Sequence, residues 1–220
     1  MDEIKVRNIF AAVSDKSILD SLLGLLDPKS VQFWGTTGTV KYLKSKAFDA
    51  QSVVSGFDFD GRVKSLDRAI FARILADRSN KKHLEELRNV IARSPSTLLG
   101  TTKQSDKKIA SPSVRDGGGG DWAPFDLVIV DLYPIDKNNF PESMDIGGQA
   151  LIRAAIKNYK NVAVAFDKES FQNLTKELKS NHQSTTLDFR YRQALKATKF
   201  ITERCITESE LFKNHDREKS

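Results

Sequence analysis

The segment FDLVIVDLY (125–133) has an uninterrupted apolar centre, and this run constrains the fold more than any other feature of the chain. A strand with one wet face alternates apolar and polar residues, whereas a strand covered on both faces does not. A second run of the same kind, NVAVAF (161–166), follows it. The two runs therefore predict an α/β fold with a parallel sheet that carries helices on both faces.

Segments with the spacing of strands and helices alternate along the rest of the chain. We expect strands at 6–13, 31–34, 51–56, 125–133 and 161–166, and helices at 17–26, 39–46, 66–78, 82–92, 169–179 and 188–211. This alternation implies right-handed crossovers and a doubly wound parallel sheet. Ligands of such sheets lie beyond the carboxyl ends of the strands.

The length and composition favour one domain. A chain of 220 residues that is 39% hydrophobic can bury one sizeable core and is short for two full domains, so we expect residues 1–220 to form a single domain. The segment 94–121 is poor in apolar residues and contains four consecutive glycines, Gly117 to Gly120. It is expected to be a disordered, flexible insertion, with a lid over the ligand as the alternative.

Charge and cysteine content restrict the function class. The formal net charge is +6, but Lys and Arg are interspersed with Asp and Glu, which favours an anionic small molecule over a nucleic acid. A single cysteine, Cys205, excludes an internal disulfide and a cysteine-based zinc site. The start of the chain, MDEIKVRNIF, resembles neither a signal peptide nor a membrane span. We expect a cytoplasmic protein that does not bind membranes.

Polar clusters follow the predicted strands at their carboxyl ends. They are SDK (14–16), GTTGT (35–39), DGRVKS (60–65), DLYP (131–134) and MDIGG (144–148). Each cluster alone is compatible with an ordinary helix cap or turn, but their shared position predicts an active site. Small residues before a helix, with Lys16 nearby, favour phosphate binding at GTTGT.

Several kinds of chemistry lack their residues. The histidines His83, His182 and His215 lie outside the clusters, and neither a metal-binding spacing nor a dinucleotide or Walker A glycine motif occurs. We therefore expect no metal and no cofactor, and chemistry that depends on Lys, Tyr and Asp.

In order and spacing, these motifs resemble the IMP cyclohydrolase domain of the bifunctional purine biosynthesis enzyme that also carries a formyltransferase domain. The resemblance runs through AVSDK (12–16), GTTGTVKYL (35–43), DGRVKSL (60–66), ILADR (74–78), FDLVIVDLYPI (125–135), DIGGQALIRAAIKN (145–158), Leu187, Arg190 and Arg192. It implies a fold like that of methylglyoxal synthase and a homodimer. No formyltransferase domain is matched, so a separate formyltransferase would supply the substrate.

The resemblance also implies a reaction: the ring of 5-formamidoimidazole-4-carboxamide ribotide closes with loss of water to give inosine monophosphate. This activity is that of a hydrolase acting on a cyclic amidine C–N bond. Four residues match the catalytic positions. Lys64 would stabilise charge on the formyl oxygen, Asp145 would accept a hydrogen bond from the carboxamide, Tyr133 would relay a proton, and Lys157 would transfer one.

Further residues match the substrate-binding positions. Those at the phosphate and ribose end are Ser14, Asp15, Lys16, Thr36, Thr37, Gly38 and Thr39. Those along the base are Arg62, Val63, Lys64, Ser65, Val130, Asp131, Asp145, Ile146 and Gly147. The N–H groups of Ile146 and Gly147 are expected to form an oxyanion hole at the start of a helix.

The chain departs from the family at three positions. Thr37 replaces a glycine, Asp67 replaces a histidine, and Asp131 replaces an asparagine, which exchanges an amide donor for an acceptor. The departures at Thr37 and Asp131 favour the alternative function, a non-catalytic module of the same fold that binds a nucleotide or phosphorylated metabolite. Methylglyoxal synthase activity is a third reading, supported by fold alone.

Lys157 poses a geometric problem. A single helix from Ile146 to Lys157 would place its ends roughly 16 Å apart, too far for both to touch one base. Either the helix begins late or two subunits share a site. Lys157 also has a purely structural reading, as a lysine that complements the helix dipole.

Overall fold

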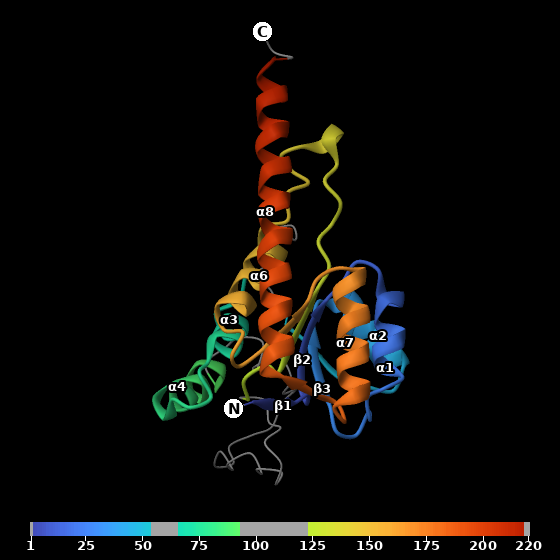
Figure 1. Cartoon of the computed structure of the whole chain (residues 1–220), viewed down its shortest axis with the longest axis vertical. Helices are drawn as coiled ribbons and strands as arrows, with labels where there is room; N and C mark the ends of the chain where they lie inside the picture. The colour runs from blue at the N-terminus through green and yellow to red at the C-terminus, as the bar shows by residue number, and fades with distance from the viewer. Residues whose placement is uncertain (1, 54–65, 93–122, 218–220) are drawn as a thin grey trace, which may run out of the picture.

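The structure, a computed structural model, describes residues 2–53, 66–92 and 123–217, and its centre is a five-stranded parallel sheet with the order β4–β3–β2–β5–β6 (Figure 1). Its strands are β2 (Asn8–Ala12), β3 (Gln32–Gly35), β4 (Asp49–Ser52), β5 (Leu127–Val130) and β6 (Ala163–Ala165). The chain builds outward from β2 to β4 and then continues on the other side with β5 and β6. The expected doubly wound parallel α/β fold is confirmed.

Helices cover both faces of this sheet (Figure 1). They are η1 (Lys16–Leu19), α1 (Asp20–Leu23), α2 (Thr37–Ser45), α3 (Arg68–Leu75), α4 (Lys81–Ala92), η2 (Lys137–Asn139), α6 (Ile146–Lys157), α7 (Lys168–Ser180) and α8 (Leu187–Arg217). The helix expected at 17–26 is a 3₁₀ turn followed by one short α-helix. The segment 94–121 lies outside the described residues.

Two apolar clusters, one on each face of the sheet, form the core. Successive residues of a strand point to opposite faces, so Ile9 packs with α1, α2 and α7 whereas Phe10 packs with α3, α6 and α8. Leu127 and Val128 divide between the two clusters in the same way. This division explains why the apolar runs of the sequence are continuous.

A short antiparallel pair was not expected from the sequence. Strands β1 (Glu3–Lys5) and β7 (Ser184–Thr186) form a separate two-stranded sheet. Next to it, Arg190 is 1% exposed and donates hydrogen bonds to the carbonyl oxygens of Thr185 and Tyr159. Burial lowers the pKa of Arg190. This arginine of the family motif therefore connects α8 to its neighbours.

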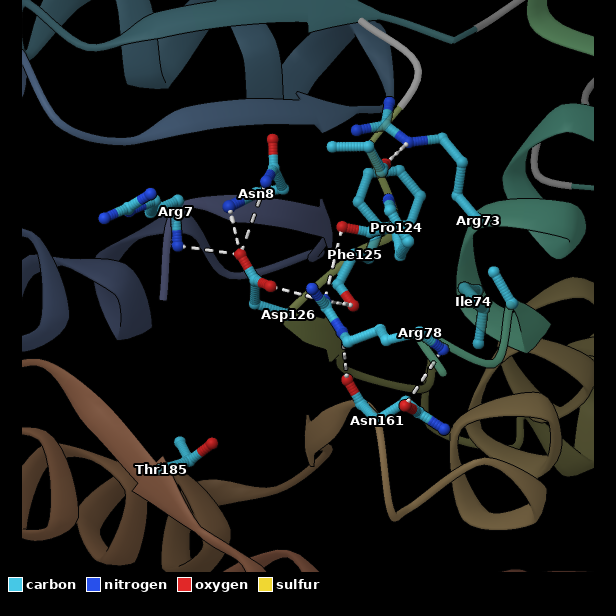
Figure 2. A network of polar contacts seen from close by, with 12 residues as sticks. Arg7, Asn8, Arg73, Ile74, Arg78, Pro124, Phe125, Asp126, Asn161 and Thr185 are labelled. Atoms are coloured by element: carbon cyan, nitrogen blue, oxygen red, sulfur yellow. Dashed lines mark hydrogen bonds and ion pairs between the residues drawn. The ribbon is translucent and has the colours of Figure 1, made fainter. Parts of the chain in front are cut away.

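At the amino edge of the sheet, Asp126 organises a polar network (Figure 2). Its carboxylate accepts hydrogen bonds from the backbone N–H groups of Arg7 and Asn8, at 2.8 and 2.7 Å, and pairs with Arg78. Arg78 also donates to the carbonyl oxygens of Phe125 and Asn161. The ILADR motif thus joins β2 and β5 at the edge opposite the strand ends that bear the polar clusters.

The protruding half of α8 is accompanied by the segment that follows β5 (Figure 1). The rings of Phe140 and Phe212 meet edge to face, with 4.6 Å between centroids. Among the described residues, no helix combines the length and apolar character that a membrane span requires.

Candidate functional site

A cavity of about 900 Å³ opens at the carboxyl ends of β2 and β5. These strands are neighbours, and the sheet is built outward from them in opposite directions, so the cavity lies at the topological switch point where α/β sheets bind ligands. Its volume is within the range of small-molecule pockets. The start of α6 and the segment that precedes it complete the walls.

Eight residues expected from the sequence line this cavity. They are Ser14, Thr36, Val130, Asp131, Tyr133, Asp145, Ile146 and Gly147. Five others lie next to these residues, in the loop after β2 and the first turns of η1 and α2, without lining it. These are Asp15, Lys16, Thr37, Gly38 and Thr39. The expected wall of the base, Arg62 to Ser65 and thus Lys64, falls outside the described residues.

Asp131 tethers the end of β5 to the loop after β2. Its carboxylate accepts hydrogen bonds from the N–H of Ser14 at 2.5 Å, the hydroxyl of Ser14 at 2.7 Å and the N–H of Asp15 at 3.1 Å. The acidic side chain therefore satisfies donors of the loop that the resemblance assigns to the ligand.

We expect Asp131→Ala to lower the free energy of unfolding by about 1–3 kcal/mol, because three donors lose one acceptor group. Asp131→Asn retains one acceptor oxygen and is the matched control, with a smaller expected loss. Urea unfolding followed by tryptophan fluorescence measures both. Equal stability of wild type and Asp131→Ala would contradict a structural role for this tether.

The amino end of α2 lies beside Lys16. Thr36 is the N-cap residue of α2 and its side chain makes no capping bond. The Lys16 ammonium donates to the Ser14 carbonyl oxygen at 2.7 Å, and a Cβ on Gly38 would lie 3.9 Å from that ammonium. A helix N-terminus with an adjacent lysine favours an anion such as phosphate.

Thr39 has a structural role in the same helix. Its side chain is 0% exposed, and its hydroxyl accepts a hydrogen bond from the N–H of Val13 at 3.3 Å. Asp67, one of the departures from the family, is the N-cap of α3 and accepts from the N–H groups of Ala69 and Ile70. Thr39 thus joins α2 to the segment after β2, whereas Asp67 caps α3.

Asp145 is the N-cap of α6 and faces the cavity. It accepts hydrogen bonds from the N–H groups of Gly148, at 2.7 Å, and Tyr133. Burial raises its pKa above the ordinary value; the two hydrogen bonds and Arg204 oppose that effect, and Asp131 adds to it. Tyr133 itself is 60% exposed. A carboxyl whose proton affinity is raised in a cavity is suited to exchange a proton or a hydrogen bond with a ligand.

Gly148 is required by this arrangement. A Cβ at this position would lie 2.7 and 2.8 Å from the two carboxylate oxygens of Asp145 and 2.5 Å from Leu132. The glycine therefore allows the carboxylate to fold back over the first turn of α6.

One wall of the cavity was not predicted from the sequence. It is formed by Pro141, Glu142 and Ser143, between the predicted clusters that end at Pro134 and begin at Met144. This segment has no helical or strand periodicity, so it carried no signal, and its position depends on the contact with α8 described above.

Lys157 lies away from the cavity. Helix α6 runs without interruption from Ile146 to Lys157, so the interpretation that it begins late is wrong. Lys157 is exposed at its carboxyl end, next to Asn158, which donates to the carbonyl oxygens of Ile74 and Ala76. About 16 Å of helix separates Lys157 from Ile146 within one copy.

Over the ranges that the structure describes, no group of three or more His, Cys, Asp and Glu residues is arranged to hold a metal ion.

Comparison with known proteins connects this geometry to a family, although no protein-family model matches the chain. The bifunctional purine biosynthesis protein PurH of Clostridium botulinum (strain Kyoto / Type A2) is 32% identical over 194 residues, 82% of this chain and 33% of that protein. PurH of Bradyrhizobium diazoefficiens is 31% identical over 205 residues, 88% of this chain and 33% of that protein. The chain is related to PurH. It spans about a third of the length of these relatives.

The similarity to PurH connects the chain to proteins of purine biosynthesis. The solved structure of ForH has the same fold, with a TM-score of 0.66 at 22% identity, over 94% of this chain and 99% of that one. The doubly wound fold that the sequence predicted for this chain is thus also found in the solved structure of ForH.

Proposed function

We propose that the chain is an IMP cyclohydrolase, which closes the ring of 5-formamidoimidazole-4-carboxamide ribotide to form inosine monophosphate. The observation that carries the proposal is the position of Asp145: its carboxyl lies at the start of α6, in a cavity at the sheet's switch point that Tyr133 also lines. The relationship to PurH adds support.

The proposed reaction needs positioning more than reactive groups, because nucleophile and electrophile belong to one molecule. The carboxamide nitrogen attacks the formyl carbon and loses one proton, while the formyl oxygen gains one. The resulting hydroxyl then leaves as water with the proton of the former formamide nitrogen. A C=N double bond completes the six-membered ring.

In the proposed reaction, groups at the start of α6 serve both steps. Asp145 accepts a hydrogen bond from the carboxamide and so favours attack. The N–H of Gly148 is occupied by Asp145, whereas those of Ile146 and Gly147 have no acceptor within the helix and face developing charge on the formyl oxygen. Tyr133 relays the proton. Lys64, assigned by resemblance, adds a positive charge.

The phosphate is assigned to the amino end of α2 with Lys16. In the proposed complex, the ribose lies along Ser14 and Thr36, between the amino end of α2 and the carboxyl group of Asp145. No metal or cofactor takes part in the proposed reaction.

Lys157 reaches a cavity only if a second copy supplies it, so we propose a homodimer with shared sites. Apolar side chains remain exposed near the cavity and on the protruding half of α8, as a subunit interface requires. They include Tyr133, Ile146, Ile206 and Phe212.

One observation favours a second candidate, a non-catalytic module that binds a nucleotide or phosphorylated metabolite. Asp131 already satisfies the N–H groups of Ser14 and Asp15. A ligand bound at this edge then has fewer donors than the family pattern provides.

Absorbance during incubation of the purified protein with the formamido ribotide tests the proposal. We expect ring closure by the wild type, and a loss of about 10²-fold or more in kcat for Lys64→Ala and Lys157→Ala. Lys44→Ala, at an exposed lysine of α2, is the control and should retain full activity. Tight binding of inosine monophosphate without turnover would instead support the non-catalytic module.

Mixing variants tests the shared site. Asp145→Asn and Lys157→Ala proteins, each strongly impaired alone, should regain activity when mixed, because some mixed dimers contain one intact site. Absence of recovery in a dimer shown to exchange subunits by native mass spectrometry would contradict sharing.

A further inference from the structure

Behind the first turns of α6 lies a buried charged cluster on α8. Glu208 is 6% exposed and accepts hydrogen bonds from the side-chain amide of Gln149, at 2.7 Å, and from Nε of Arg204, at 3.3 Å. The side chain of Arg204 is 12% exposed. The PurH resemblance assigned no role to any of these three residues.

Gln149 connects this cluster to the cavity. Its backbone N–H donates to the Asp145 carbonyl oxygen at 3.3 Å, and its side chain contacts Glu208. The α8 cluster therefore packs against the same turn of α6 that positions the Asp145 carboxylate.

Arg204 has more hydrogen-bonding capacity than its contacts use. Its Nη2 atom is buried and has no hydrogen-bond partner among the described residues. A buried guanidinium that is only partly compensated projects positive potential into its surroundings. Asp145 is within reach of that potential, which opposes the rise in its pKa.

The other charged and titratable groups around Asp145 act differently. Asp131, after β5, disfavours a charged Asp145, and Glu142, on the segment before α6, lines the same cavity. Tyr133 contributes its backbone N–H to the carboxylate. Glu208 reduces the effect of Arg204 because the two are paired. Among the described residues, Arg204 is thus the positive group that favours a charged Asp145.

We propose that Arg204 is a positioning residue, which holds the first turns of α6 through Glu208 and Gln149 and thereby favours the charged form of the Asp145 side chain. Its importance for turnover rests on the cyclohydrolase proposed above. Its effect on the ionisation of Asp145 does not, and can be measured on the protein alone.

The experiment follows the side-chain carboxyl carbon of Asp145 by NMR in protein labelled with ¹³C-aspartate, with Asp145→Asn used for assignment. Arg204→Met removes the positive charge and should raise the pKa of Asp145. Glu208→Gln removes the compensating charge and should lower it. Opposite shifts are not expected from a purely structural defect.

Lys199→Met is the matched control, because it removes a lysine from the same helix whose side chain is 79% exposed and pairs with Glu203. It should leave the titration unchanged. Arg204→Lys retains the charge and should shift the titration less than Arg204→Met. If Arg204→Met folds and leaves the pKa of Asp145 unchanged, or if Glu208→Gln shifts it in the same direction, the proposal is overturned.

Activity separates this inference from the proposed function. In an active enzyme that needs the Asp145 carboxylate ionised, the acidic limb of the kcat/KM profile moves to higher pH in Arg204→Met. If the variants shift the NMR titration as expected but the wild type does not close the ring, the role proposed for Arg204 is supported and the cyclohydrolase proposal is refuted. If Arg204→Met closes the ring and neither its acidic limb nor its Asp145 titration has moved, the role proposed for Arg204 is refuted and the cyclohydrolase is not.

Discussion

Asp145→Asn is expected to reduce the rate of ring closure by about 10²- to 10³-fold, the usual range for loss of a general acid–base group, while the protein remains folded. Asparagine is as good an N-cap as aspartate, so the start of α6 is kept through the N–H of Gly148. The substituted amide does not stabilise positive charge that develops on the carboxamide nitrogen during attack.

The same substitution has an expected effect on stability with a defined sign. Burial raises the pKa of Asp145 in the folded protein above the ordinary value of about 3.9. The folded state then holds this proton more tightly than the unfolded chain does. The resulting stabilisation is complete below the unfolded pKa and is lost as pH rises through the folded pKa. Asparagine lacks this dependence.

Relative to wild type, Asp145→Asn should therefore gain unfolding free energy as pH increases from about 4 to 7. Urea unfolding at several pH values, together with kcat at neutral pH, measures both effects. A variant that loses stability relative to wild type over this interval would show that the carboxylate is stabilised by its surroundings. Full activity of Asp145→Asn would remove this residue from the mechanism.

Gly35→Ala is expected to prevent folding. A Cβ at Gly35 would lie 2.0 Å from the carbonyl oxygen of Ala11, its partner in the ladder between β2 and β3. The obstructing atom belongs to the backbone of a central strand and cannot rotate away. We expect a loss of more than about 4 kcal/mol, a large fraction of the stability of a domain.

Gly24→Ala is the matched control, because Gly24 has a helical backbone (φ −64°) and a Cβ there would meet its neighbours at 3.7 Å or more. It should stabilise the protein by about 0.4–1 kcal/mol through the entropy of the unfolded chain. Circular dichroism and thermal unfolding of both variants decide the matter. A folded Gly35→Ala protein with near wild-type stability would show that β2 and β3 are farther apart than described.

Local patterns in the sequence were sufficient for most of the sheet. Four apolar runs coincided with β2, β3, β5 and β6, whose residues are largely buried on both faces and so carry the signal. The strand expected at 51–56 overlaps β4 (Asp49–Ser52) only in part, because β4 is an edge strand in which Ala50 alone is buried. The pair β1–β7 escaped prediction because each strand has three residues and its partner lies more than 180 positions away in the chain, at Glu3 and Thr186. Its pairing leaves no periodicity to detect.

The cavity could be anticipated for a similar reason. Parallel strands end at one edge, so the motifs after β2, β3 and β5 had to converge, and Ser14, Thr36 and Asp131 do so. The wall at Pro141 to Ser143 could not be anticipated, because an aperiodic segment is placed only by what it packs against. The pairing of Phe140 with Phe212 is such a contact.

By itself, the sequence determined the doubly wound sheet and the edge at which its polar motifs meet, since both depend on residues that are close together in the chain. Only the tertiary structure decided that Asp131 bonds to Ser14, that Lys157 lies a full helix away from Asp145, and that Arg204 stands behind α6. These relations join side chains from distant segments. They follow from the packing of whole elements, in which the position of one residue depends on all the others in contact with it.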